Sequence, residues 1–344
     1  MRQLFPIRAH TFNQFTLEKM KNFIKTPYIY EIEPTNHCPY TCIMCPKGLG
    51  RMKRPLGFMK LDTFQIILEQ FPPSQKLVRM HHFGEAVLHP GIDKMLKSVH
   101  EQGLFSVLSL NPASLTLKLN RKIAKSGVDL VCFSLDAFNN EGLHKIRGIK
   151  RSYENCRAMI DDFIAVSRKL NRNILKVIQM VRLDANKEDC KKFQDIKKIY
   201  PESDVSLYLA ENNGFGNLDI VEQTLVGGSR YILPGTPCGT PFSEVAILWN
   251  GDVVLCCYDY DGFNVIGNVH EEKLSKMWQG SKVNKIRALF ENRQTRSLPL
   301  CSNCFLAPDN FRKGVKLSVK GVEEERTILK ILSDTQCSSF FKIW

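Results

Sequence analysis

The stretch YIYEIEPTNHCPYTCIMCP, residues 28–46, joins a strand pattern to a tight group of thiols. Apolar and polar residues alternate in YIYEIE, which predicts a β-strand over residues 28–33. Cys38, Cys42 and Cys45 follow it, with three and then two residues between them. Two thiols suffice for a disulfide and four complete a zinc site, so three indicate a metal site whose last position stays open for another ligand.

The length and composition of the chain are those of a globular protein with one large and one smaller domain. Of its 344 residues, 43% are hydrophobic and 24% are charged, and the N-terminus lacks the apolar run of a signal peptide. No stretch approaches the roughly 18 apolar residues of a membrane helix. We therefore expect a cytoplasmic protein without membrane association, whose 12 cysteines stay reduced. Seven of them fall in two groups that indicate metal or cluster binding rather than disulfides.

The net charge of +13 raises the question of an anionic partner. Basic residues are spread along the chain and come no denser than short runs such as KGLGRMKR at 47–54. This even spread favours a solvated basic surface over nucleic-acid binding. The positive charge is also compatible with an anionic substrate or an acidic peptide as partner. Arg51, Lys53 and Arg54, just after the thiols, could meet such a substrate or could equally be solvated.

From residue 28 to about residue 211, strand patterns alternate with amphipathic helix patterns. Strands are predicted at 28–33, 76–83, 105–110, 129–135, 174–182 and 205–210. Between them, segments such as LDTFQIILEQF (61–71) and GIDKMLKSVHEQG (91–103) carry an apolar face with the helical period. Six βα units of this kind predict an α/β fold with a parallel sheet, either curled into a partial barrel or wound as an open sheet.

The alternation stops after about residue 211, and a second, smaller domain is predicted. EVAILWNGDVVLCC (244–257) predicts a hairpin around Asn250-Gly251, a preferred type I′ turn pair. The boundaries that we expect are an N-terminal extension at 1–27, the domain of βα units at 28–225, the smaller domain at 226–320 and a tail with a helical pattern at 321–344. The cysteines of the smaller domain, which as metal ligands would stabilise it, are Cys238, Cys256, Cys257, Cys301 and Cys304.

Small or polar residues follow four of the predicted strands at equivalent ends. The cysteine run follows the first strand, Gly84 and Glu85 follow the second, Asn111 follows the third, and Ser134 and Asp136 end the fourth. Loops after the carboxyl ends of parallel strands are where such folds place function. We therefore expect these residues to line one site, with strand-end capping as the competing interpretation for each.

The CxxxCxxC spacing after a first strand resembles the hallmark of the radical S-adenosylmethionine (SAM) enzymes. The resemblance covers nearly the whole chain and implies a partial (β/α)6 TIM-like barrel. It also implies that Cys38, Cys42 and Cys45 hold a 4Fe–4S cluster whose open iron binds SAM, and that an electron from the cluster cleaves SAM to a 5′-deoxyadenosyl radical. The sequence departs from the family's pattern at Met44, the residue before the third cysteine, where the family frequently has an aromatic residue. Structural or zinc-binding thiols are the competing interpretation, disfavoured because no fourth ligand follows nearby.

The same resemblance implies contacts to SAM. Gly84 and Glu85 are similar to the family's Gly-Gly-Glu segment, which contacts the methionine amino group. Glycine lets a backbone approach a ligand, and a carboxylate accepts hydrogen bonds from an ammonium. Asn111, Ser134 and Asp136 are similar to the polar strand ends that contact the ribose and carboxylate of the cofactor.

Other candidates near these residues are less specific. Arg147 in HKIRG matches a recurring element of the family without a defined role. His81 and His82 lie in the predicted strand at 76–83, where neighbours point to opposite faces, so they cannot readily share a metal ion. We expect both to pack, or one to face the barrel interior near substrate. Buried core thiols are expected at Cys132, Cys156 and Cys190.

The C-terminal part resembles the SPASM extension of these enzymes, a twitch-like domain that binds auxiliary iron–sulfur clusters. It has the Gly-x4-Cys element, which ends at Cys256, and the Gly-Asn and Trp landmarks. The resemblance implies one auxiliary 4Fe–4S cluster held by Cys238, Cys256, Cys301 and Cys304. Cys257 could replace Cys256 as ligand, and a zinc knuckle is the competing interpretation. A fully ligated cluster can still exchange an electron, so we expect an oxidation.

The two resemblances together predict a radical SAM/SPASM oxidoreductase-like enzyme that abstracts hydrogen from an unactivated C–H bond. No leader-binding domain fits before Cys38, which favours a sugar-like or other small-molecule substrate and its oxidation, epimerisation or decarboxylation. We expect an external electron donor such as flavodoxin or ferredoxin. A maturase of a ribosomal peptide with a separate leader-binding partner is the alternative, and a non-catalytic zinc or nucleic-acid protein is the third hypothesis. The sequence assigns no catalytic hydrogen donor.

Overall fold

The strands of the protein form one mixed sheet in the computed structural model, which describes residues 25–200, 204–224, 238–304 and 307. They are β1 (Tyr28–Ile32), β2 (Leu77–Arg79), β3 (Phe105–Leu110), β4 (Leu130–Ser134), β5 (Leu175–Arg182), β6 (Ser206–Glu211), β7 (Glu244–Ile247), β8 (Asp252–Val254) and β9 (Val265–Asn268). Their order is β6-β5-β4-β3-β2-β1-β7-β8-β9. Neighbours from β6 to β7 are parallel, while β8 and β9 pair antiparallel. The predicted α/β class with a mostly parallel sheet is confirmed.

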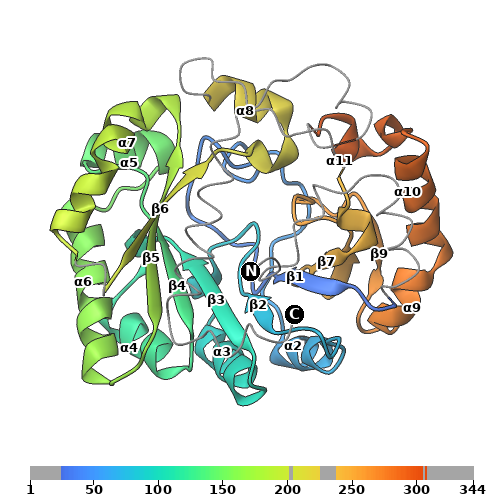
Figure 1. Cartoon of the computed structure of the whole chain (residues 1–344), viewed down its shortest axis with the longest axis horizontal. Coiled ribbons are helices and arrows are strands. Elements are labelled where there is room, and N and C mark those ends of the chain that lie inside the picture. Colours follow the sequence, from blue (N-terminus) through green and yellow to red (C-terminus); the bar gives the residue numbers. More distant parts are fainter. Residues whose placement is uncertain (1–24, 201–203, 225–237, 305–306, 308–344) are drawn as a thin grey trace, which may run out of the picture.

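Helices connect the parallel strands, and α3, α4 and α6 lie on the outside of the sheet (Figure 1). The helices are α2 (Leu61–Leu68), α3 (Ile92–Glu101), α4 (Leu117–Lys125), α5 (Asn140–Arg147), α6 (Tyr153–Lys169), α7 (Lys187–Lys192), α8 (Leu218–Thr224), α9 (Leu274–Gln279), α10 (Ser281–Glu291) and α11 (Pro299–Ser302). Because β1 to β6 lie side by side in chain order, this part of the sheet is singly wound. It lacks the reversal of strand order that defines a doubly wound fold.

The two faces of the parallel strands differ in what covers them. Val131 and Phe133 are completely buried in the main core, and the Phe133 ring lies 5.5 Å from the ring of Phe163 in α6. The alternate residues Leu130 and Cys132 belong to a small separate cluster on the opposite side. We call that opposite side the inner face. The helices α3, α4 and α6 lie on the other side of these strands (Figure 1).

β2 ends at Arg79, whereas the sequence predicts a strand to residue 83. The prediction that His81 and His82 lie in a strand and point to opposite faces is therefore wrong. Nε2 of His81 lies 3.4 Å from Oε1 of Glu31, and Nδ1 of His82 lies 3.2 Å from Oε1 of Glu33. Adjacent side chains of a regular strand could not both reach carboxylates of the same neighbouring segment, so these contacts require the strand to end first.

The hairpin between β7 and β8 is closed by the amide of Leu248, which donates to the carbonyl of Asp252 at 2.9 Å and leaves residues 249–251 as the loop. The predicted two-residue type I′ turn is therefore wrong. The amide of Gly251 donates to the carbonyl of Leu248 at 2.9 Å. A type I′ turn needs a positive φ at both central residues, but φ is positive at Gly251, +89°, and not at Asn250. The wider loop lets the amide of Trp249 donate to the Glu33 carboxylate at 3.2 Å. A contact with a distant segment thus accompanies the longer turn.

β7 joins the C-terminal part of the chain to the first strand. It runs parallel to β1, with Ile32 opposite Ile247. The amide of Glu33 continues this pairing by donating to the carbonyl of Ile247 at 2.9 Å. The segments that the sequence assigns to two domains therefore share one sheet, and backbone hydrogen bonds place them relative to each other.

Two sequence predictions concern residues outside the described part of the chain. The N-terminal extension at 1–27 is described only from residue 25, and the helical pattern of the tail at 321–344 lies outside the described residues. None of the described helices combines the length and the apolar composition that crossing a bilayer requires.

Candidate active site

The loop that carries the three predicted cluster ligands rests on the end of α5. We call residues 36–48 the cysteine loop. The amides of Thr41 and Ile43 donate to the carbonyls of Arg147 and Ile146, each at 3.0 Å. The last carbonyls of a helix have no partner within the helix. The cysteine loop satisfies two of them, which fixes the loop on the helix.

Burial raises the pKa values of the cysteine-loop thiols. The pKa of Cys38 rises to about 12 and that of Cys42 to about 11. The charges of Cys42 and Cys45 add to the effect of burial at Cys38, so the three thiols share one electrostatic environment. Arg147 opposes the shift at Cys42, with its Nη1 3.8 Å from the sulfur. Metal binding has to displace protons from these thiols and is therefore pH-dependent.

Gly84 lets the segment after β2 pass directly against the backbone before the cysteine loop. A Cβ at Gly84 would lie 1.9 Å from the carbonyl oxygen of Thr35, so another residue would force the two backbones apart. The amide of Glu85 donates to the carbonyl of His37 at 2.8 Å. The structure thus brings the predicted cofactor residues Gly84 and Glu85 next to Cys38.

Glu85 and Asn111 leave two complementary polar atoms unpaired. Oε2 of Glu85 accepts from the amide of Asn111 at 3.1 Å, and Oδ1 of Asn111 accepts from the amide of Ala113 at 2.9 Å. Oε1 of Glu85, an acceptor, and Nδ2 of Asn111, a donor, are buried without a hydrogen-bond partner among the described residues. Buried polar groups are normally paired. The two atoms fit the ammonium and carboxylate of an α-amino acid, such as the methionine part of SAM.

Replacing Glu85 by glutamine is expected to stabilise the metal-free protein as the pH rises. Burial raises the pKa of Glu85 from 4.5 to about 8, against the hydrogen bond from the Asn111 amide. The folded state keeps a proton that the unfolded state loses, so wild-type stability falls between about pH 5 and pH 8. Glutamine removes this dependence, so its advantage should grow through that interval to about 3–5 kcal/mol.

Urea denaturation of both proteins from about pH 5 to pH 9 measures this difference. The exposed Glu69→Gln variant is the matched control, and its stability should follow the wild-type curve. A Glu85→Gln curve that stays parallel to the wild-type curve would contradict the raised pKa.

Asp136 lies beneath the site and anchors Arg147. One carboxylate oxygen accepts from the amide of Val181 at 2.6 Å, and the other pairs with Nε of Arg147. The carboxylate is completely buried, and a contact with the cofactor would compete with these bonds. Ser134, which is half-buried, ends β4 on the inner face. Asp136 thus holds Arg147, whose Nη1 lies beside the Cys42 sulfur.

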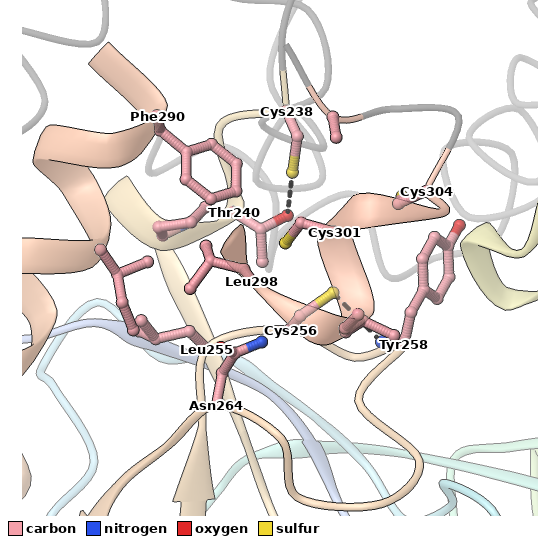
Figure 2. A pocket seen from close by; sticks show the side chains of 14 residues that line it. Cys238, Thr240, Leu255, Cys256, Tyr258, Asn264, Phe290, Leu298, Cys301 and Cys304 are labelled. Atoms are coloured by element: carbon pink, nitrogen blue, oxygen red, sulfur yellow. Dashed lines mark hydrogen bonds between the residues drawn. The ribbon is translucent and has the colours of Figure 1, made fainter. Parts of the chain in front are cut away.

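The four cysteines predicted to hold the auxiliary cluster line one pocket (Figure 2). They are Cys238, Cys256, Cys301 and Cys304. They come from three separate segments, and apolar side chains such as Leu255 and Phe290 make up much of the remaining wall. Burial raises the pKa of Cys238 to about 11. An apolar shell of this kind controls solvent access and reduction potential at a metal site.

Cys256 rather than Cys257 faces this pocket. A hydrogen bond with Cys257, then burial, raises the pKa of Cys256, and the charges of Cys238 and Cys304 add to the shift. The pocket thiols are thus close enough to influence one another. Within the described ranges, no three Cys, His, Asp or Glu side chains converge as the ligands of a single metal ion do.

Two of the three basic residues after the cysteine loop are engaged by protein carboxylates. Arg51 forms an ion pair with Asp219, and Arg54 donates to Glu33 with Nη1 at 2.7 Å. Lys53 is exposed, and its Nζ donates to a backbone carbonyl at 2.7 Å. Of the three, only Lys53 stays available to an anionic substrate. Sequence reasoning missed Glu33 altogether, because its partners come from segments that no local pattern connects to it.

Two protein-family models match the chain. The Radical SAM superfamily model matches residues 32–192, and the SPASM model, an iron–sulfur cluster-binding domain, matches residues 238–305. The first range includes the cysteine loop, Glu85, Asn111 and Asp136. The second includes all four cysteines of the auxiliary pocket.

Two curated relatives match different shares of the chain. The tungsten-containing aldehyde ferredoxin oxidoreductase cofactor-modifying protein of Pyrococcus furiosus is 35% identical over 112 residues, which is 32% of this chain and 30% of the relative. The chain thus matches less than a third of that relative's length. The S-adenosyl-L-methionine-dependent 2-deoxy-scyllo-inosamine dehydrogenase of Niallia circulans is 22% identical over 278 residues, or 80% of this chain and 91% of the relative.

A solved structure with a similar fold is that of SuiB from Streptococcus suis bound to precursor peptide SuiA. The TM-score is 0.59 at 16% identity, and the match covers 86% of this chain and 73% of the other. SuiB has also been solved bound to S-adenosylmethionine. At this identity, the likeness concerns the fold alone.

Proposed function

Because the chain belongs to the radical SAM superfamily and carries a C-terminal SPASM domain, we propose that it abstracts hydrogen from a small, sugar-like substrate. The two domains imply SAM and two 4Fe–4S clusters as cofactors. When bound, these supply a 5′-deoxyadenosyl radical and a one-electron acceptor. Oxidation is the outcome that we favour, with epimerisation and decarboxylation as the other results of the same abstraction.

The residues around the cysteine loop would hold the first cluster and SAM. Cys38, Cys42 and Cys45 would ligate the cluster, and Glu85 and Asn111 would bind the amino-acid end of SAM through their unpaired atoms. The observation that carries the proposal is this unpaired acceptor and donor beside three thiols of one loop. Gly84 contributes by letting the Glu85 backbone approach the loop.

The auxiliary pocket would hold the second cluster. Cys238, Cys256, Cys301 and Cys304 would occupy all four ligand positions, which leaves no open iron for substrate. The pocket therefore suits electron transfer, and it supports an oxidation as the net reaction. An apolar wall of this kind limits the access of solvent to a bound cluster.

We further propose that β1 to β6 curl into the partial barrel of this family, with substrate on the inner face. Polar groups gather there at the ends of β1, β2 and β4. The Arg79 guanidinium lies 4.4 Å from the centre of the Tyr30 ring, His81 pairs with Glu31, and Gln179 lies opposite Ser134 in register. An apolar substrate would leave such groups desolvated and unpaired. They suit a molecule that carries hydroxyl or amino groups.

The comparisons support two substrate classes unequally. The inosamine dehydrogenase relative is named for a small molecule and matches most of both chains, which supports a small-molecule substrate. SuiB, solved with a precursor peptide, keeps peptide maturation with a separate leader-binding partner as the second candidate. Both reactions need an external electron donor such as flavodoxin or ferredoxin.

Deuterium transfer tests the proposal. The protein is reconstituted anaerobically and incubated with SAM, a reductant and a deuterated cyclitol or amino sugar, and 5′-deoxyadenosine is analysed by mass spectrometry. We expect deuterium in 5′-deoxyadenosine from at least one such compound, and none after heat inactivation. Transfer only from deuterated peptides would reassign the enzyme to peptide maturation. No transfer from either class would contradict hydrogen abstraction.

A further inference from the structure

A buried ionic group made of Glu33, Arg54 and His82, which we call the clamp, links the two candidate cofactor sites. The side chains of these residues are 0%, 9% and 1% exposed. Two terminal nitrogens of Arg54 bind the two carboxylate oxygens of Glu33, one of them at 2.7 Å. Nδ1 of His82 lies 3.2 Å from the same carboxylate. Charges so deeply buried persist only when each is paired, so the three side chains depend on one another.

On one side, the clamp binds the segment that carries the auxiliary ligand Cys256. Nε2 of His82 lies 3.0 Å from the carbonyl oxygen of Cys257, and Nε of Arg54 donates to the carbonyl of Tyr260 at 2.7 Å. Cys257 follows Cys256 directly in the chain. The imidazole therefore acts on the backbone one residue away from a predicted cluster ligand.

On the other side, the clamp belongs to the segments that build the SAM site. Glu33 directly follows β1, and its amide continues the pairing with β7. His82 precedes Gly84, whose close packing against Thr35 places the Glu85 side chain. Movement of the clamp would therefore change the separation of the two cofactor sites.

The hydrogen bonds of the clamp require a positive charge on His82. The carboxylate of Glu33 and the carbonyl of Cys257 are both acceptors, so both ring nitrogens must carry hydrogen. Although burial opposes ionisation of Glu33, the hydrogen bonds of the clamp lower its pKa to about 2. The other carboxylates that face the ring are Glu31, 4.0 Å from Nε2, and Asp259, whose pKa is raised by burial while the His82 charge partly opposes the rise.

We infer that the clamp sets both the position and the reduction potential of the auxiliary cluster, with His82 as the positioning residue. The bond from His82 to Cys257 holds the backbone beside Cys256. A positive charge near a cluster ligand favours the reduced, more negative state of the cluster and makes it a better electron acceptor. The inference rests on Cys256 as a ligand. It goes beyond the proposed hydrogen abstraction, which precedes any electron transfer to the auxiliary cluster.

The test compares His82→Gln with His81→Gln in the reconstituted protein. Glutamine carries no charge, and its single amide nitrogen cannot reach Glu33 and the Cys257 carbonyl together as the two ring nitrogens do. The control removes the neighbouring imidazole, which pairs with Glu31 instead. In a redox titration followed by electron paramagnetic resonance, the auxiliary cluster of His82→Gln should be reduced at a more negative potential than in the wild type. His81→Gln should keep the wild-type potential. An unchanged potential in His82→Gln, or equal shifts in both variants, overturns the inference.

A second readout uses the metal-free chain. In His82→Gln, loss of the hydrogen bond from the imidazole to the Cys257 carbonyl should raise the alkylation rates of Cys256 and Cys257 about tenfold. This factor corresponds to the free energy of one hydrogen bond that involves a charged group. Mass spectrometry locates the modified thiols, and Cys38 serves as the internal reference. If His82→Gln does not fold, Arg54→Lys should show the same increase, because lysine keeps the charge but loses the planar fork. Unchanged rates overturn the inference.

The ligand assignment is tested separately. Cys256→Ala should lose about four irons per chain. If Cys256→Ala retains that iron, Cys256 is not a cluster ligand and the clamp inference fails. The assignments of the first cluster and of hydrogen abstraction would be unaffected. Loss of that iron, together with an unchanged potential in His82→Gln, would overturn the role of the clamp alone.

Discussion

Replacing Cys38, Cys42 and Cys45 together by alanine is expected to lower the iron content from about eight to about four per chain and to abolish SAM cleavage. The three thiols lie in one loop docked on α5 and share one electrostatic environment, so their cluster should be lost as a unit. The auxiliary pocket contains none of these residues, so its cluster should remain. Iron and sulfide are counted after anaerobic reconstitution, and 5′-deoxyadenosine is followed by chromatography.

The matched control replaces thiols of the core. Cys132 and Cys156 are buried as the sequence predicts, whereas Cys190 is half-buried, with its sulfur 3.2 Å from Oδ1 of Asn186. Alanine at Cys132 and Cys156 should leave the iron content unchanged. Zinc in the wild-type protein, or iron that does not fall in the triple variant, would contradict the cluster assignment.

Replacing Asp136 by alanine is expected to lower the free energy of unfolding by about 3–5 kcal/mol. The carboxylate is completely buried and binds both Arg147 and the amide of Val181. Without it, the Arg147 guanidinium remains beside Cys42 as a buried cation that has lost its partner. Chemical denaturation of the metal-free chain measures the loss.

The Asp136→Asn variant separates charge from shape. Asparagine can still accept from the Val181 amide but cannot neutralise Arg147, so its stability should lie between those of wild type and Asp136→Ala. The exposed Asp62→Ala variant is the control, with an expected change within about 0.5 kcal/mol. A loss below about 1 kcal/mol in Asp136→Ala would show that Arg147 does not depend on this anchor.

Features that depend only on neighbouring residues could be predicted from the sequence. The strand predicted at 105–110 is observed as Phe105–Leu110, because a period of two directly reports a strand with two different faces. The spacing of the three thiols after β1 puts them in one short loop whatever the rest of the chain does. Gly84 and Glu85 lie in the segment after the next strand. Their place near the thiols could be predicted because parallel strands present their carboxyl ends at the same edge of the sheet.

The pairing of side chains from distant segments could not be predicted, because it depends on the three-dimensional fold. Asp136 turns to Arg147, Cys256 rather than Cys257 enters the pocket, and His82 meets Glu33 and Cys257. These choices depend on where β2 ends and on the pairing of β1 with β7. The end of β2 and the pairing of β1 with β7 bring together segments that are far apart in the chain. The free energy of such contacts comes from burial and charge pairing in three dimensions, which the local periodicity of a sequence does not encode.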